Sequence, residues 1–108
     1  MSDKHQFANF AEFYPYYLAE HSDPICRQLH FVGTSLIVIL WLWVLATQNW
    51  WWLLATPLIG YGLAWTGHFF FERNRPATFD YPLYSLLGDW VMWKDMLLRR
   101  IDFGANGV

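Results

Sequence analysis

The feature that most constrains this chain is a run of 44 residues, 28–71, without a single Asp, Glu, Lys or Arg. Gln48 and Asn49 divide the run into two apolar segments, residues 29–47 and 51–71. Each segment is close to the ~20 residues that a helix needs to cross a ~30 Å hydrocarbon core. Because backbone polar groups in lipid must pair within their own segment, both segments are predicted to be helical. The sequence therefore predicts an all-α integral membrane protein built on a two-helix transmembrane hairpin.

The composition supports one membrane domain over residues 1–108. Charged residues make up 15% of the chain, against about 25% in soluble domains. A buried hairpin inside a soluble helical protein is the alternative, but a chain of 108 residues has too few polar faces to cover one. The net charge of −2 and the lack of Lys/Arg-rich runs argue against a nucleic-acid partner.

The basic residues predict the orientation of the hairpin. All seven lie outside it: Lys4, Arg27, Arg73, Arg75, Lys94, Arg99 and Arg100. Since cytoplasmic loops carry an excess of Lys and Arg, both termini are predicted to be cytoplasmic. A bacterial inner membrane and the endoplasmic reticulum both remain open as the host membrane.

Amphipathic segments flank the hairpin on both sides. Aromatic residues recur at helical spacing over residues 7–21, although Pro15 favours a break there. Residues 83–101 place leucines on one side and Ser85 and Asp89 on the other, as in a helix that lies on a membrane surface. Within the hairpin, Gly60 and Gly62 are expected to let another helix approach closely.

Three histidines and a carboxylate are predicted to meet at the cytoplasmic end of the hairpin. His30 and His68 each lie nineteen residues from Asn49, one on either side. In an antiparallel hairpin, equal offsets give equal depth, here ~28 Å from the turn at ~1.5 Å per residue. His21 and Glu72 flank the same end.

This arrangement has three interpretations. His68 and Glu72 share a helix face, and a His and carboxylate set suits zinc or non-haem Fe(II). The histidines can instead be interfacial side chains of a non-enzymatic membrane interaction or scaffold protein. Haem held between His30 and His68 is the third. His5, near the N-terminus, is not expected to take part in a site.

Arg27, Arg73 and Arg75 cluster at the same end of the hairpin. They can serve topology and lipid headgroup contact. They can also bind an anionic substrate, because a guanidinium fork fits a carboxylate.

Two segments carry a family resemblance. Residues 16–33 read YYLAEHSDPICRQLHFVG, and residues 67–79 read GHFFFERNRPATF. Their marks are a tyrosine-rich stretch before His21, a second histidine nine residues later followed by a glycine, and a GHxxFE segment leading to a proline. Over residues 13–90 the chain resembles the membrane-embedded, Mpo-like 2-hydroxy fatty acid dioxygenase family.

The resemblance implies an Fe(II)-dependent enzyme that uses O2 to remove one carbon from a 2-hydroxy fatty acid, a step of fatty acid α-oxidation. The resemblance also implies that His21, His30 and His68 are iron ligands. It implies that Glu72 is a fourth ligand or a partner that orients His68. The expected partners are the lipid bilayer, the 2-hydroxy fatty acid and O2. A second copy of the chain, forming a homo-oligomer, is another expected partner, since a two-helix hairpin can need one to enclose a substrate.

Overall fold

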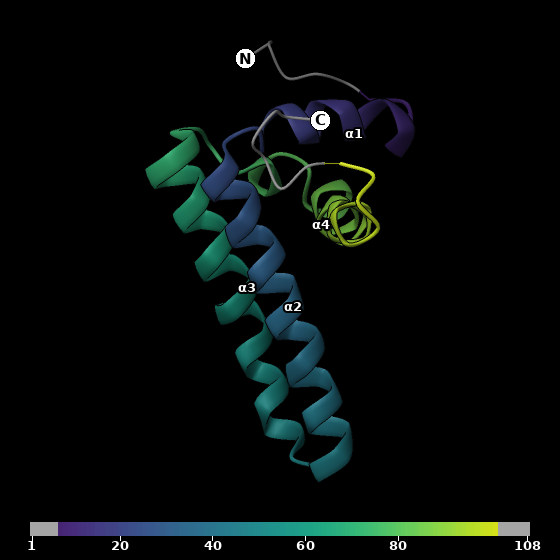
Figure 1. Ribbon diagram of the computed structural model, residues 1–108, viewed down its shortest axis with the longest axis vertical. Coiled ribbons are helices and arrows are strands. Elements are labelled where there is room, and N and C mark those ends of the chain that lie inside the picture. The colour runs from purple at the N-terminus through teal and green to yellow at the C-terminus, as the bar shows by residue number, and fades with distance from the viewer. Residues whose placement is uncertain (1–6, 102–108) are drawn as a thin grey trace.

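The computed structural model describes residues 7–101, and this part of the chain is all-α, without strands. His5 lies outside the described residues. Figure 1 shows a long antiparallel pair of helical limbs with two shorter helices across one end. The elements in chain order are α1 (Phe10–Ala19), α2 (Pro24–Thr47), η1 (Trp50–Leu54), α3 (Ala55–Thr66), η2 (Gly67–Glu72), η3 (Ala77–Phe79) and α4 (Pro82–Leu97).

Local signals set both ends of α2. The Asp23 side chain accepts hydrogen bonds from the backbone N–H groups of Ile25 and Cys26, at 2.9 and 3.1 Å. Pro24 occupies the first helical position, where its missing N–H costs nothing. At the other end, Gln48 adopts a left-handed conformation with φ 62° and its N–H bonds to Val44 O. The chain then reverses direction.

The returning limb differs from the single helix expected for residues 51–71. It divides into the 3₁₀ segment η1, the 12-residue helix α3 and the π-helix η2. Within residues 7–101, α2 alone is long and apolar enough to cross a membrane by length and composition, with a mean hydropathy of 2.1. The all-α prediction is therefore confirmed, whereas two uninterrupted spanning helices are not.

Glycines let the two limbs of the hairpin pack closely at two positions. A Cβ added at Gly67, the first residue of η2, would lie 2.8 Å from the Cys26 sulfur. Gly60 is also close to α2, since its added Cβ would meet Ile37 Cδ1 at 3.2 Å. Gly62, by contrast, faces open space. The close approach expected at both Gly60 and Gly62 therefore occurs only at Gly60.

The short helices α1 and α4 pack on each other beside the end of the hairpin opposite the Gln48–Asn49 turn (Figure 1). Helix α1 continues through Pro15, so the break expected there does not occur. Gly88 of α4 lies against the Tyr17 ring, which an added Cβ would meet at 2.9 Å. Together these contacts form a small core of fully buried side chains, including Phe13, Tyr17, Met92 and Met96.

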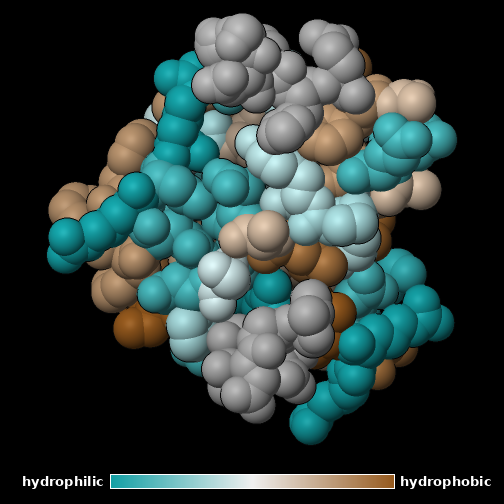
Figure 2. Space-filling model, turned by 90° about the horizontal axis from the view of Figure 1, so that it is seen from above, coloured by the Kyte–Doolittle hydropathy of each residue, from teal (hydrophilic) through white to brown (hydrophobic). Residues whose placement is uncertain are grey.

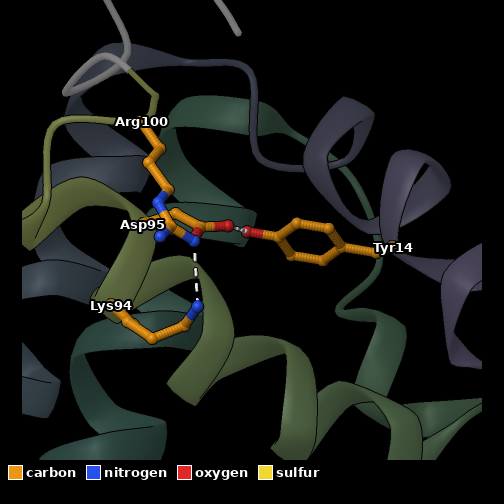
Figure 3. Close-up of polar contacts among 4 residues, drawn as sticks. All are labelled: Tyr14, Lys94, Asp95 and Arg100. Carbon is orange, nitrogen blue, oxygen red and sulfur yellow. Dashed lines mark hydrogen bonds and ion pairs between the residues drawn. The ribbon is translucent and has the colours of Figure 1, made fainter.

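A polar contact joins the two short helices. The Tyr14 hydroxyl donates to the Asp95 carboxylate at 2.7 Å, and Lys94 and Arg100 lie 3.5 and 3.9 Å from the same carboxylate (Figure 3). Helix α4 ends at Leu97, before the expected residue 101, and Arg99 turns the chain with φ 63°. The backbone N–H of Arg100 then bonds back to Asp95 O.

Polar and apolar surfaces are separated along the molecule. Seen from the end at which α1 and α4 lie, the visible surface carries many hydrophilic residues, with hydrophobic residues among and beside them (Figure 2). Apolar side chains of the hairpin point outward, and Leu42, Trp51 and Leu58 are 62%, 83% and 77% exposed. A soluble monomer rarely exposes so much contiguous apolar surface, and a membrane would cover it.

Candidate metal centre

Three imidazoles converge where the hairpin meets the short helices. His21 lies in the loop between α1 and α2, His30 lies in α2, and His68 lies in η2. The Nε2 atom of His21 is 3.1 Å from His30 Nε2 and 2.9 Å from His68 Nε2. All three residues are buried, with exposed fractions of 1%, 6% and 2%. Three separate parts of the chain therefore bring their histidine side chains to the same buried point.

Backbone carbonyls fix the tautomers of two of these rings. His21 Nδ1 lies 2.6 Å from Tyr17 O, and His30 Nδ1 lies 2.9 Å from Cys26 O. A carbonyl oxygen can only accept a hydrogen bond, so each Nδ1 must carry the proton. Each Nε2 consequently presents a lone pair to the other imidazoles.

The third ring is fixed by a side chain. His68 Nδ1 lies 2.7 Å from Asn74 Oδ1. The Asn74 amide is itself oriented, because its NH2 donates to the backbone and side-chain oxygens of Glu20 at 3.0 and 3.2 Å. The amide oxygen therefore faces His68, which donates from Nδ1 and keeps its lone pair on Nε2.

Three converging lone pairs cannot hydrogen-bond to one another, whereas a shared cation would stabilise them. The spacing fits this interpretation, because two ligand nitrogens ~2.1 Å from an ion and at right angles to each other lie ~3.0 Å apart. Neutral imidazole suits zinc, copper, iron and nickel. The donor set therefore fits a divalent transition-metal ion but does not choose among these metals. Outer partners such as Asn74 are typical of metal-binding histidines.

Burial also keeps His21 in the form that binds metal. It lowers the pKa of the His21 imidazole well below its usual value of 6.5, and the charges of protonated His30 and His68 would lower it further. The ring is therefore neutral at pH 7. Because the unfolded chain takes up the proton more readily, the folded state loses stability as the pH falls below about 6.5.

Arg27, expected as a substrate ligand, has other partners. It is fully buried, and its guanidinium donates to His21 O at 3.0 Å and to Leu18 O at 3.3 Å. Leu18 lies in the last turn of α1, and His21 lies in the loop that follows it. Arg27 thus holds the loop that positions His21, and it does not line the cavity beside the imidazoles.

Three other residues expected at the site also lie outside it. The Glu72 carboxylate accepts a hydrogen bond from the Asp23 backbone N–H, and Glu72 is not among the converging ligands. Arg73 and Arg75 are exposed and line a separate surface groove. Arg75 pairs with Asp80 at 3.4 Å. The structure therefore brings together the three histidines without the carboxylate or the arginines.

A small cavity of about 20 Å³, which we call the head cavity, lies beside the imidazoles. Its wall includes Trp65, Ser85 and Asp89, none of which the sequence indicated as a site residue. Ser85 Oγ and Trp65 Nε1 are buried there without a hydrogen-bond partner. Such atoms are costly unless a ligand satisfies them.

The orientation of α4 explains why Ser85 and Asp89 were not predicted as site residues. Its leucines face outward, with Leu83 79% and Leu86 53% exposed, whereas Ser85 is 3% exposed. The polar side of this helix was expected to face solvent, but it faces the protein. The polar stripe in the sequence could have indicated this orientation. A helix lying on a membrane turns its apolar side to the lipid, which leaves its polar side to face the protein.

Asp89 is joined to the histidines through Tyr17. The Tyr17 hydroxyl donates to the Asp89 carboxylate, and the Tyr17 ring stacks on His21 with 4.0 Å between centroids. Burial raises the pKa of the Asp89 carboxyl to about 7, against the opposing effect of the Tyr17 hydrogen bond. Asp89 can therefore hold or release a proton near neutral pH.

Removing the amide that orients His68 is expected to weaken metal binding. We expect Asn74→Ala to lower metal affinity by about 10- to 100-fold, the usual effect of losing such an outer partner. Asn74→Asp keeps an acceptor for His68 Nδ1 and should retain most of the affinity. Chelator competition measures both constants, and an unchanged affinity in Asn74→Ala would contradict this role.

Residues 7–101 match the family described as 2-hydroxy-palmitic acid dioxygenase Mpo1-like. No curated protein and no solved structure matches the chain. The family match covers every described residue, including the three converging histidines. On this evidence the chain belongs to the 2-hydroxy-palmitic acid dioxygenase Mpo1-like family.

Proposed function

We propose that this protein is an Fe(II)-dependent dioxygenase that removes one carbon from 2-hydroxy fatty acids. The observation that carries the proposal is the convergence of three Nε2 lone pairs, with two of the separations 2.9 and 3.1 Å. The family description supports the substrate class. When bound, ferrous iron with free coordination positions would supply O2 activation and a Lewis-acidic site for the substrate hydroxyl and carboxylate.

The residues of the head cavity suit a 2-hydroxy acid. Ser85 Oγ–H and Trp65 Nε1–H can donate to the substrate carboxylate, which would satisfy two polar atoms that lack partners. Asp89, held by Tyr17, can accept the proton of the 2-hydroxyl group or return one. The buried surroundings exclude bulk water and strengthen these interactions.

Neutral donors to the carboxylate should act mainly on substrate binding. We expect Ser85→Ala and Trp65→Phe each to raise KM for 2-hydroxyhexadecanoate roughly tenfold, as for a hydrogen bond to a charged group. Metal content should stay unchanged in both variants, because neither residue contacts an imidazole nitrogen. Steady-state kinetics with metal analysis tests this, and a wild-type KM in both variants would contradict it.

We further propose a membrane-embedded hairpin with both termini on the cytoplasmic side. Its support is the charge-free run of residues 28–71, the outward-facing apolar side chains and the exposed leucines of α4. Helices α1 and α4 would then lie at the membrane surface, next to the metal centre. A fatty acid could enter from the bilayer without leaving lipid, and two copies of the chain can associate through the hairpin.

The other interpretations of the histidines are less well supported. Interfacial anchors would expose their polar ends to water, whereas these three imidazoles are buried. Haem would need space for a porphyrin between two histidines, but the head cavity measures only about 20 Å³. A metal-free scaffold would also leave three lone pairs facing one another.

Oxygen uptake by the iron-loaded protein tests the proposed function. Detergent-purified protein supplied with Fe(II) should consume O2 in the presence of 2-hydroxyhexadecanoate and release a product one carbon shorter. Zinc-loaded protein and the His68→Ala variant should do neither. Iron-loaded protein that leaves the 2-hydroxy acid unchanged would overturn the proposal.

A further inference from the structure

A second and larger cavity adjoins the metal centre. It measures about 190 Å³, and His30, Tyr61, Ala64 and Asp89 line both it and the head cavity. The two spaces therefore share a wall, which includes the His30 imidazole. We call the larger space the tail cavity.

One stripe from each of three helices encloses the tail cavity. Its residues occur as single positions or adjacent pairs that recur three or four apart, which places them along one side of each helix. They are His30, Thr34 and Ile37 in α2; Thr56, Pro57, Gly60, Tyr61 and Ala64 in α3; and Leu86, Asp89 and Trp90 in α4. The wall advances by seven residue steps from His30 to Ile37 and from Pro57 to Ala64, so the cavity follows the hairpin for ~10 Å.

The polarity of the wall changes along this length. His30 and Asp89 lie at the metal end, whereas Ile37, Pro57 and Gly60 lie farther along the hairpin. An occupant must therefore have a polar head at the metal and an apolar body extending away from it. Of common metabolites, a single-chain fatty acid has this form.

A tryptophan marks the far end. The Trp41 indole N–H donates to Thr56 Oγ1 at 2.9 Å, and its ring centroid lies 5.7 Å from that of Trp90. Thr56 and Trp90 both line the tail cavity. Trp41 thus joins its α3 wall to its α4 wall about one helical turn beyond Ile37.

We propose that the tail cavity binds the first methylenes of the substrate's alkyl chain, and that Gly60 keeps this space open. The proposal rests on the proposed function, since it places the tail of the same 2-hydroxy fatty acid. The remaining carbons of a long chain would pass between the helices into lipid. Selection for a long-chain substrate then lies in the hairpin, apart from the residues that hold the head.

Gly60 and Gly62 provide a matched pair of substitutions. A leucine at position 60 would project toward Ile37, because even its Cβ would lie 3.2 Å from Ile37 Cδ1. A Cβ at position 62 would meet nothing within 4 Å, so a leucine there would begin in open space. Both changes add the same side chain to the same helix, so they differ in whether the tail cavity is filled.

The first measurement is photocrosslinking of zinc-loaded protein with a 2-hydroxy fatty acid that carries a diazirine near its head group. Adducts mapped by mass spectrometry should fall on tail-cavity residues such as Tyr61, Leu86 and Trp90 in the wild type and in Gly62→Leu. They should be lost in Gly60→Leu that retains its metal. Adducts elsewhere, or equal labelling of both variants, would overturn the proposal.

The second measurement compares chain lengths in iron-loaded protein. Gly60→Leu should lower kcat/KM for 2-hydroxyhexadecanoate about 10- to 100-fold, because each methylene left unburied weakens binding about fourfold. The value for 2-hydroxybutyrate, which has almost no tail, should stay within about twofold. Equal losses for both acids in metal-replete Gly60→Leu would contradict a tail site.

The two measurements separate this proposal from the proposed function. Suppose the wild-type protein forms adducts on tail-cavity residues but does not turn over any 2-hydroxy acid. This result would support the tail site and contradict the dioxygenase assignment. If the wild type turns over the acid and Gly60→Leu and Gly62→Leu change kcat/KM equally, the result would support the dioxygenase and contradict the tail site. Should Gly60→Leu lose its metal, Thr34→Leu fills the same cavity from α2 and is tested in the same way.

Discussion

Replacing His30 or His68 by alanine is expected to lower metal affinity by well over about 100-fold and to abolish oxygen-dependent turnover. Loss of an outer partner alone costs a metal site 10- to 100-fold, so loss of a direct ligand should cost more. The two residues left would have one lone pair each and could not hold the ion in place. Chelator competition and oxygen uptake measure the two effects. His5→Ala is the matched control and should retain both properties.

Thermal unfolding in detergent tests independently whether His30 binds the metal. Metal should raise the Tm of the wild type, because an ion that binds only the folded state stabilises it. In His30→Ala this rise should disappear. Without metal, the variant should be at least as stable as the wild type, since the substitution removes one of three facing lone pairs. A metal-free His30→Ala protein much less stable than the metal-free wild type would indicate a structural role instead.

Replacing Arg27 by methionine is expected to destabilise the protein by about 3 kcal/mol or more. The change removes the charged donor from the buried His21 carbonyl and leaves the Leu18 carbonyl with backbone donors such as the His21 N–H, and buried groups that lose a charged partner usually cost this much. Arg73→Met is the control, because exposed substitutions of this kind usually change stability by less than about 0.5 kcal/mol. Denaturation in detergent measures both.

The Arg27 experiment also separates two roles for this residue. A substrate-binding arginine would give a stable Arg27→Met protein with full metal content and a raised KM. An arginine that positions the His21 loop would give reduced stability and weaker metal binding together. The structure predicts the second result, since the guanidinium faces two carbonyl oxygens and not the head cavity.

Helical periodicity and the spacing of charges allowed much of this architecture to be predicted from the sequence. The equal offsets of His30 and His68 from Asn49 placed both at one end of the hairpin, and the structure brings them together there. His21 was included because it flanks that end and matches the family pattern. These predictions succeed because helix geometry converts sequence spacing directly into depth.

The remaining features depend on contacts that spacing does not encode. The i to i+4 relation of His68 and Glu72 assumed an α-helix, but the segment is a π-helix, in which that relation no longer holds. Glu72 accordingly bonds to Asp23 instead of joining the imidazoles. Asn74 could not be predicted as a partner of His68, because the contact depends on the turn after η2 that brings the two residues together. Ser85 and Asp89 were assigned to a solvent face because the orientation of α4 is a tertiary property.

The most direct test of the central claim is metal analysis by mass spectrometry on protein prepared anaerobically with iron supplied. The wild type should contain about one iron per chain. The variants His21→Ala, His30→Ala and His68→Ala should each contain almost none, whereas Glu72→Gln, which leaves all three imidazoles in place, should retain it. A wild type without metal, or iron retained in all three histidine variants, would contradict the three-histidine centre on which the account depends.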